Sequence, residues 1–329
     1  MNPIAAIARG GDRRRRVWTQ AAFLALFVLA PPLDLLRFDL HAGHAWFLGM
    51  PWRLGVDDFA AGRIDAAAAA LRVAVRLVLP IAAVAVLLLA VAWRWGRVYC
   101  GWLCPHFSVV ETLNGLLRRA IGRHSLWDRA PGPIEEQADG SRWLRRADGG
   151  RDRIVPAAGA LYVVLAIGFA FLWAVVLLTY LLPPAEIYAG LAHGALTRNQ
   201  ATFIVAATCA FSIEFLFARH LFCRYGCAVG LFQSIAWMSN PRAMTVDFDR
   251  ARAADCARCP ARLGRGQAAC EDACPMRLNP RTARRRMFAC TQCASCIRAC
   301  GAVQRGAPQG ALLGWADGER EPGPRPWKN

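Results

Sequence analysis

The sequence predicts an α-helical polytopic membrane protein with a cysteine-rich C-terminal segment. Hydrophobic residues make up 56% of the 329-residue chain, a share that points to a membrane protein. Four apolar stretches have about the 20 residues that a helix needs to cross a bilayer. Eight of the 13 cysteines lie between Cys256 and Cys300, in two closely spaced groups. The chain is therefore expected to join a membrane domain to a metal-binding segment.

The four apolar stretches are expected to form two repeated hairpins of transmembrane helices. Pro31–Pro32 and Pro80 interrupt the first two stretches, which a packed bundle tolerates. The basic run Arg13–Arg16 before the first stretch is also found in signal peptides. No convincing small-residue cleavage site follows it, so we expect a retained anchor. The stretches run Val17–Leu36, Leu71–Trp93, Ile154–Leu182 and Ala201–Ala218.

Arginines in the loops predict the orientation. They are dense before the first stretch and in loop 94–153, whereas loop 37–65 carries three arginines against four aspartates and loop 183–199 carries only Arg198. The positive-inside rule then places both termini in the cytoplasm of a bacterial inner membrane. The formal charge of +17 comes almost wholly from arginine. Because no recognition helix or aromatic-basic interleaving accompanies it, we expect the lipid bilayer as a partner and no nucleic acid.

The second cysteine group has the spacing of a bacterial ferredoxin. It reads Cys290-x2-Cys293-x2-Cys296-x3-Cys300, a run whose thiolates hold a cubane [4Fe–4S] cluster. Structural zinc is the alternative, because CxxC pairs also bind zinc. Zinc needs only two pairs in each site, whereas this run offers four thiolates with no intervening loop. Iron–sulfur binding, and hence a redox protein, is the favoured interpretation.

The first group would complete a two-cluster ferredoxin set. It reads Cys256-x2-Cys259, then ten residues, then Cys270-x3-Cys274 before a proline. In such sets the fourth cysteine of each run ligates the other cluster. The ten-residue interval is longer than usual, so the first cluster is expected to differ from the second. The expected ligand sets are Cys256, Cys259, Cys270 and Cys300 for one [4Fe–4S] cluster, and Cys290, Cys293, Cys296 and Cys274 for the other.

These features divide the chain into four predicted parts. Residues 1–16 form a basic cytoplasmic N-terminus, and residues 17–240 form the four-helix transmembrane domain. Residues 241–312 form the ferredoxin-like domain with two [4Fe–4S] clusters, and residues 313–329 form a polar tail.

An internal repeat places two further cysteine pairs at the ends of the predicted hairpins. Cys100 and Cys104 follow the second apolar stretch, and Cys223 and Cys227 follow the fourth. If each C-x3-C motif continues its helix, its two cysteines share one face, and four thiols converge at the cytoplasmic membrane face. We favour a redox or metal role over simple packing of helix ends. Arg97, Arg219 and Arg224 are placed to favour thiolates if they point inward. Cys209, alone inside the fourth stretch, is expected to pack.

The histidines do not suit a haem relay across the membrane. None of the six lies inside an apolar stretch, whereas a bis-histidine haem needs paired ligands at membrane depth. His41 and His44, in the first outer loop, are candidates for contact with a metal or quinone. As loop residues they are also typical of a solvated surface.

With these parts in place, the chain resembles the CcoG/RdxA/FixG family of membrane-bound ferredoxin-like proteins. The matching features are Cys100-Gly-Trp-Leu-Cys104-Pro105, the second C-x3-C motif, Phe232-Gln233-Ser234, Gly49-Met-Pro-Trp52 and the terminal cysteine groups. The NapH and NosR families share them more loosely. Ala228 departs from the pattern, which has proline after the second motif. The family's fifth span and outward immunoglobulin-like domain have no counterpart in the printed sequence.

The resemblance implies support for maturation of a cbb-type haem–copper oxidase through reduction of Cu(II) to Cu(I) on the cytoplasmic side. On this interpretation the chain is an oxidoreductase of the cupric reductase kind, with copper at Cys100, Cys104, Cys223 and Cys227, and copper-transport and oxidase-assembly proteins as partners. Thiolates suit Cu(I), which is a soft ion. One alternative is a NapH-type subunit that oxidises quinol. Another is a non-catalytic assembly factor with structural clusters.

Overall fold

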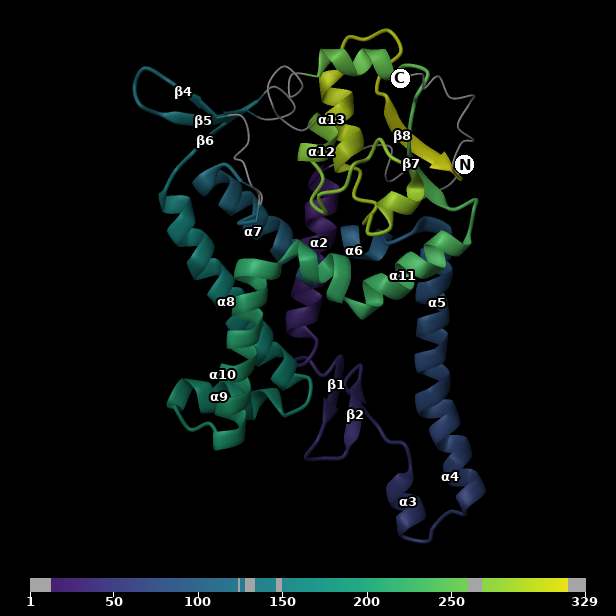
Figure 1. Cartoon of the computed structure of the whole chain (residues 1–329). Helices are drawn as coiled ribbons and strands as arrows, with labels where there is room; N and C mark the ends of the chain where they lie inside the picture. The colour runs from purple at the N-terminus through teal and green to yellow at the C-terminus, as the bar shows by residue number, and fades with distance from the viewer. Residues whose placement is uncertain (1–12, 124, 128–133, 146–149, 260–267, 319–329) are drawn as a thin grey trace. The chain divides into compact units, whose positions relative to one another are not determined.

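The computed structural model describes residues 13–123, 125–127, 134–145, 150–259 and 268–318 (Figure 1). These residues form two compact units, and each contains segments that are distant in sequence. The first comprises the described parts of Met1–Gln20, Leu89–Tyr162 and Arg219–Asn329. The second comprises Ala21–Leu88 and Val163–Ala218. Each unit is considered below by itself.

Among the described residues, three helices are long and apolar enough to cross a membrane. They span Ala66–Trp95, Ala157–Thr179 and Arg198–Ala218, with 30, 23 and 21 residues. The sequence predicted all three, each within a few residues of these bounds. The first consists of α4 (Ala66–Val73), a π-helical turn (Ala74–Val78) and α5 (Leu79–Trp95). The second is α8 (Ala157–Thr179), and the third joins α10 (Arg198–Ile213) to a π-helical turn (Glu214–Ala218).

Pro80 explains the irregular turn in the first of these helices. Proline has no amide hydrogen, so it cannot donate to the carbonyl of Arg76 one turn earlier. The indole Nε1 of Trp52 donates to that carbonyl instead, at 2.9 Å. Arg76 in turn donates to the carbonyl of Arg53 at 2.7 Å. The segment Trp52–Arg53 thus satisfies the backbone group that the proline leaves open.

Helix α2 (Arg13–Leu29) contains most of the first predicted span, but it has only 17 residues and begins with four arginines. It ends just before Pro31–Pro32, whose fixed backbone angles do not continue a helix. Leu36, the expected end of the span, belongs to a strand. A membrane crossing by α2, and with it the layout of four spans in two hairpins, stays a prediction.

A small antiparallel sheet follows α2. Its strands are β1 (Leu36–Asp39), β2 (His44–Phe47) and β3 (Met50–Trp52). Arg37 lies opposite Trp46 in the register, and Ala45 lies opposite Trp52. A second sheet contains β4 (Ile134–Glu136), β5 (Arg142–Arg145) and β6 (Arg151–Arg153), and two short helices are α3 (Val56–Ala60) and α9 (Pro184–His193).

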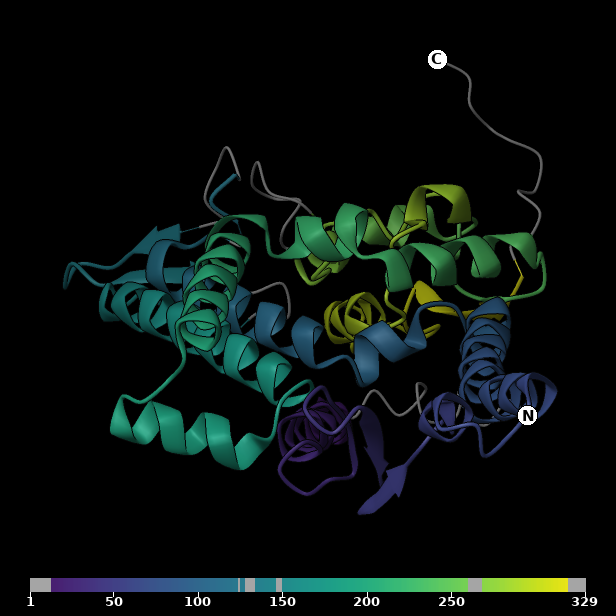
Figure 2. The ribbon, with the colours of Figure 1, turned by 90° about the horizontal axis from the view of Figure 1, so that it is seen from below.

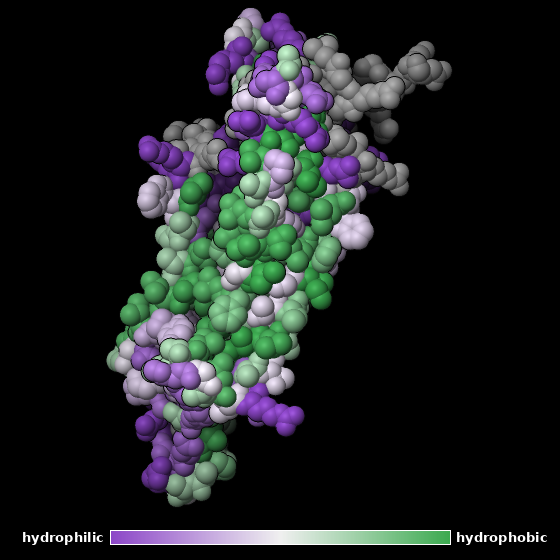
Figure 3. Space-filling view, turned by 90° about the vertical axis from the view of Figure 1, so that its left-hand side faces the viewer, coloured by the Kyte–Doolittle hydropathy of each residue, from purple (hydrophilic) through white to green (hydrophobic). Residues whose placement is uncertain are grey.

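Apolar side chains of the membrane-type helices remain on the surface. Within the helix Ala66–Trp95, an apolar stretch of 18 residues has no buried residue. On α8, Leu161, Val164 and Ile167 are exposed. Figure 3 shows apolar side chains gathered over the face that it presents, with hydrophilic side chains beyond them. Exposed apolar surface of this extent is typical of helices that face lipid.

The cysteine-rich C-terminal segment is enclosed by a pair of strands. Strand β7 (Met244–Phe248) precedes the cysteine groups, and β8 (Leu313–Asp317) follows them. The two strands pair antiparallel, with Val246 opposite Trp315. Between them lie α12 (Ala269–Asp272), α13 (Ser295–Val303) and two 3-10 turns (Ala253–Arg258 and Arg284–Met287). The pairing brings β8 into this fold, although the sequence analysis assigned its residues to the polar tail.

Three further helices of the same unit carry or support the C-x3-C motifs. They are α6 (Val98–Trp102), α7 (Pro105–Ile121) and α11 (Ala228–Ser239). Helix α7 buries Phe107, Val110, Leu113 and Leu117 along one face, as an amphipathic helix does. Helix α11 lies beside the cysteine-rich segment in two perpendicular views (Figures 1 and 2), and the Ser234 hydroxyl donates to the carbonyl of Phe288 at 2.8 Å.

Candidate iron–sulfur site and the paired C-x3-C motifs

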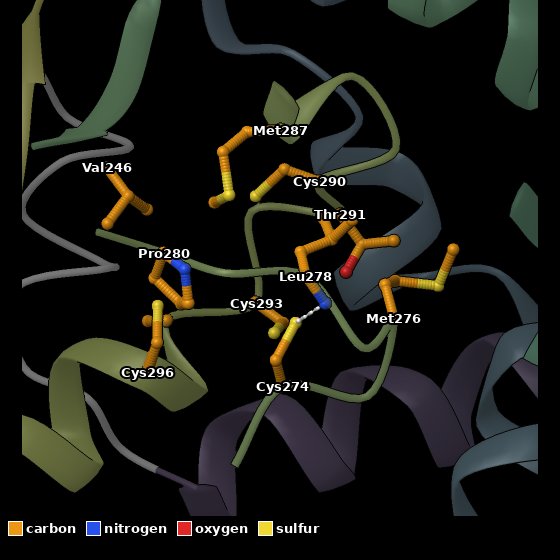
Figure 4. Close-up of a pocket in the computed structure, with 11 residues that line it drawn as sticks. Val246, Cys274, Met276, Leu278, Pro280, Met287, Cys290, Thr291, Cys293 and Cys296 are labelled. Atoms are coloured by element: carbon orange, nitrogen blue, oxygen red, sulfur yellow. Dashed lines mark hydrogen bonds between the residues drawn. The ribbon is translucent and has the colours of Figure 1, made fainter. Parts of the chain in front are cut away.

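Four cysteines line one pocket in the C-terminal segment. They are Cys274, Cys290, Cys293 and Cys296, and apolar groups such as Met287 and Leu278 complete the walls. Figure 4 shows these side chains coming from separate stretches of the chain and meeting around the same space. The sequence analysis expected this set for one [4Fe–4S] cluster, with Cys274 crossing over from the first group. The four thiol donors and the apolar walls of the pocket fit such a cluster.

The loop that carries three of these cysteines has an uncommon backbone. Gln292 and Ala294 have φ angles of 54° and 59°, in the left-handed region that side chains other than glycine rarely adopt. Each such residue costs about 1 to 3 kcal/mol, and these costs are found mainly at functional sites. Here the left-handed turns allow Cys290, Cys293 and Cys296 to surround one space within seven residues. The backbone is shaped around the pocket.

Backbone amides donate hydrogen bonds to several of the cysteine sulfurs. The amide of Leu278 lies 3.4 Å from the sulfur of Cys274 (Figure 4). The amide of Ala269 lies 3.3 Å from Cys259, and that of Leu312 lies 3.3 Å from Cys300. Hydrogen bonds of this kind favour the thiolate and tune the potential of an iron–sulfur cluster. They support cluster ligation over simple packing.

The remaining four C-terminal cysteines form a second neighbourhood. Burial raises the pKa of Cys300, and the nearby thiols of Cys256 and Cys259 raise it further. Burial also raises the pKa of Cys270 to about 12; Arg281 lowers it, while Cys300 and Cys259 are among the neighbours that raise it. This grouping matches the crossed set expected from the spacing. Most of the ten-residue interval after Cys259 lies outside the described residues.

These cysteines do not converge on one ion. Within the described residues, no three side chains of the His, Cys, Asp and Glu types are placed to hold a single metal. A structural zinc ion requires four ligands at about 2.3 Å, whereas each thiolate of a cubane cluster binds a different iron. Four cysteines spaced around a pocket therefore fit a cluster better than zinc.

The two C-x3-C motifs have the same local design. Cys100 lies in α6, and Cys104 is the N-cap of α7. Cys223 lies in a π-helical turn (Phe222–Gly226), and Cys227 is the N-cap of α11. The helix breaks inside each motif, so the expectation that the cysteines share a face of one continuous helix is wrong.

The residue after each motif opens the new helix. Pro105 and Ala228 occupy the same first position, in α7 and α11. Proline suits that position because its missing amide hydrogen would have no partner there. Alanine also suits a helix, so the departure at Ala228 leaves the local fold unchanged.

The structure brings three of the four motif cysteines together. The thiols of Cys100 and Cys227 each act on the pKa of Cys104, which burial raises to about 11. Cys100 contacts Gln233 on α11, with 3.4 Å between its sulfur and Oε1. Cys223 is paired differently, with its sulfur 3.6 Å from Nδ1 of His106. The site is thus three neighbouring thiols beside a Cys–His pair.

The arginines near these motifs differ in what they contact. Burial raises the pKa of Cys100 even though Arg97 acts to lower it. Burial also raises the pKa of Cys104, so neighbouring arginines do not offset desolvation at these two thiols. Arg219 lies over the ring of Tyr162 at 5.5 Å, and Arg224 lies over Tyr225 at 5.1 Å. The charge of Arg97 acts on Cys100 in the direction that the sequence suggested.

The first motif contacts the pocket loop directly. A Cβ atom on Gly101 would lie 2.1 Å from the carbonyl oxygen of Thr291, the residue between Cys290 and Cys293 in the pocket wall. Beside it, the indole Nε1 of Trp102 donates to the carbonyl of Gln292 at 3.1 Å. Sequence spacing carried no signal for this contact.

His41 and His44, in the loop before the first long helix, make ordinary polar contacts. His41 lies 3.5 Å from the carboxylate of Glu186, and its side chain is 60% exposed. His44 has Nδ1 3.0 Å from the carbonyl of Ala42 and packs on Trp46. Cys209, on α10, is exposed, so it does not pack as expected.

Comparison with known proteins supports an iron–sulfur electron-transfer protein. Residues 76–124, which include Cys100 and Cys104, match the 4Fe–4S binding domain family Fer4_5. The chain is 23% identical over 211 residues to YccM of Escherichia coli (strain K12), named as an electron transport protein. That alignment covers 62% of this chain and 48% of YccM, so the chain spans about half the length of this relative. No solved structure matches. The CcoG/RdxA/FixG resemblance stays a prediction.

Proposed function

We propose that the protein is a membrane-bound iron–sulfur oxidoreductase that reduces Cu(II) to Cu(I) on the cytoplasmic side of a bacterial inner membrane. Two [4Fe–4S] clusters, held by the eight C-terminal cysteines in crossed sets, would supply the electrons. The C-x3-C cysteines would hold the acceptor. Each turnover moves one electron: a reduced cluster is oxidised by one unit, and Cu(II) becomes Cu(I).

The contact between Gly101 and Thr291 is the observation that carries this proposal. It sets the backbone beside Cys100 directly against the loop that carries Cys290 and Cys293. An electron leaving a cluster in that pocket would have a short, packed route to the motif. Both sites belong to one compact unit, so the route requires no movement of the other unit.

The motif cysteines suit the product of the reaction. Soft thiolate ligands favour Cu(I) over harder divalent ions. Cys100, Cys104 and Cys227 are neighbouring thiols, and Cys223 lies beside His106. Because no three such donors converge on one point among the described residues, the proposed Cu(I) would be held by a pair of them. The raised pKa of Cys104 keeps this thiol protonated until a metal displaces its proton. Copper delivered by a transport protein and passed to an oxidase-assembly protein would fit such a site.

The match over residues 76–124 favours a second candidate at the same place. The family is one of 4Fe–4S binding domains, and this stretch contains only two cysteines, Cys100 and Cys104. The motif would then carry electrons to quinone, or take them from quinol as NapH-type subunits do, without binding copper. A non-catalytic assembly role is the third interpretation.

A double substitution, Cys100→Ser with Cys104→Ser, tests these candidates. We expect loss of Cu(II) reduction by the dithionite-reduced protein, with the EPR signals of both C-terminal clusters unchanged. The matched control is Cys209→Ser, which should reduce Cu(II) at the parental rate. Parental Cu(II) reduction by the double variant would contradict the proposal. Exchange of electrons with quinone but not with Cu(II) would establish the second candidate instead.

A further inference from the structure

A buried positive charge lies between the two C-x3-C motifs and the cysteine pocket. Arg97 is only 2% exposed, and its Nη2 donates to the carbonyl of Cys223 at 2.8 Å. Among the described residues, no aspartate or glutamate pairs with Arg97, and its Nε has no hydrogen-bond partner. A buried charge without a counter-charge costs several kcal/mol. The fold therefore needs a negative group near Arg97.

The guanidinium lies where the two motifs meet the pocket loop. A Cβ on the preceding residue, Gly96, would lie 2.6 Å from Nε2 of Gln292, between Cys290 and Cys293. The charge of Arg97 also acts on the thiols of Cys100 and Cys290. On the other side the guanidinium packs against α11, where a Cβ on Gly230 would lie 2.1 Å from Nη2. Helix α11 thus holds the guanidinium in place beside the sulfur ligands.

The neighbouring Arg16 provides a contrast. Its guanidinium also acts on a pocket cysteine, Cys293, but it forms a bidentate ion pair with Glu111, with 2.9 Å between Nη1 and Oε1. Its charge is therefore largely cancelled. Arg97 has no such carboxylate partner among the described residues.

We infer that Arg97 is the counter-charge of the cluster ligated by Cys274, Cys290, Cys293 and Cys296, and that it raises the reduction potential of that cluster above the value its ligands alone would set. A cubane cluster with four thiolates is anionic, and reduction adds one more negative charge. A fixed cation nearby stabilises the reduced form more than the oxidised form, and the effect is larger in a buried, low-dielectric site. This inference rests on the clusters of the proposed function, but not on copper as the acceptor.

The position of Arg97 also favours one direction of electron flow between the two clusters. Its charge acts on Cys290 in the pocket, whereas Arg281 is the arginine that acts on Cys270 in the other group. Raising one potential selectively would draw electrons to the cluster whose loop contacts Gly101. That is the cluster nearest the proposed acceptor.

The test is a potentiometric EPR titration of the purified full-length protein. In Arg97→Gln we expect the midpoint potential of one cluster to shift to a more negative value, while that of the other stays at the parental value. Arg97→Lys keeps the charge, so the midpoint potential of that cluster should stay close to the parental value. The control is Arg94→Gln, because Arg94 lies three residues away, is half-buried and pairs with Asp317 at 3.1 Å. It should change neither potential.

A second pair of variants moves the guanidinium without removing it. Gly230→Ala places a methyl group where Nη2 lies, and we expect a negative shift of the same cluster. Gly115→Ala is the matched control, because a Cβ there meets nothing within 4 Å. If Arg97→Gln loses its iron, the midpoint potentials of Gly230→Ala and Arg97→Lys decide whether the charge of Arg97 sets the potential of this cluster. Unchanged potentials in the iron-replete Arg97→Gln and Gly230→Ala variants would overturn the inference. If the variants show these shifts but the parent protein does not reduce Cu(II), only the proposed acceptor is overturned.

Discussion

Gly101 and Thr291 are in backbone contact, although 190 positions separate them in the sequence. A Cβ on Gly101 would meet the Thr291 carbonyl oxygen at 2.1 Å and the Cβ of Cys293 at 3.5 Å. Glycine is therefore required at this point of the C-x3-C motif. The same residue's carbonyl accepts a hydrogen bond from Nε of Arg16 at 2.7 Å, so three separate segments meet at one position.

Gly101→Ala should weaken the electronic contact between the pocket and the motif. The methyl group forces the motif away from a backbone carbonyl, which cannot move as a flexible side chain would. We expect a loss of about 1 to 3 kcal/mol in the free energy of unfolding, and slower oxidation of the reduced clusters by Cu(II) in stopped-flow measurements. Gly115→Ala, which meets no neighbour, should match the parent in both assays. Parental oxidation kinetics in Gly101→Ala would show that electrons leave by another route.

Crossed ligation predicts which cysteines affect the same cluster. Cys274→Ser should disturb the EPR signal that Cys290→Ser disturbs, because both residues line one pocket. Cys270→Ser should disturb the other signal, in common with Cys300→Ser. Iron and acid-labile sulfide in the parent should each approach about eight per chain if there are two [4Fe–4S] clusters. A shared effect of Cys270→Ser and Cys274→Ser would instead indicate that each group holds its own cluster.

Binding of Cu(I) to the first motif should depend on pH. The pKa of Cys104 is raised to about 11 by burial, so at pH 7 this residue is a protonated thiol. The bound form is the thiolate, and each thiol ligated must release a proton. We therefore expect affinity to rise with pH, by about tenfold per unit for each proton released. Competition with a Cu(I) chelator at pH 7 and pH 8 measures the change. An affinity independent of pH would argue against thiolate ligation.

The membrane topology can be tested with reporter fusions. Arginine asymmetry predicts that Gly140, in the turn between β4 and β5, and Gly318, after β8, are both cytoplasmic. The three long helices alone would give an odd number of crossings. For both termini to lie in the cytoplasm, α2 must cross the membrane as well. A periplasmic signal at either position would contradict four spans with both termini inside. In that case α2, with its four arginines and 17 residues, would be the first helix to reassign.

The sequence by itself determined the long helices and predicted an iron–sulfur protein. The helices at Ala66–Trp95, Ala157–Thr179 and Arg198–Ala218 were predictable because solvation by lipid acts on each segment separately. The spacing rule for two-cluster ferredoxins predicts a ligand set of Cys274, Cys290, Cys293 and Cys296, and these four cysteines line one pocket.

Only the tertiary structure decided what joins the sites. Gln233, Thr291 and Arg97 belong to different helices and loops, and no local pattern relates them. The break inside each C-x3-C motif also depends on the next helix, which begins where packing allows it to begin. Burial, rather than the sign of the neighbouring charges, set the pKa of Cys100, because desolvation depends on every segment packed around a group. A sequence lists charges and thiols, whereas their distances and their exclusion from water arise only when distant segments pack together.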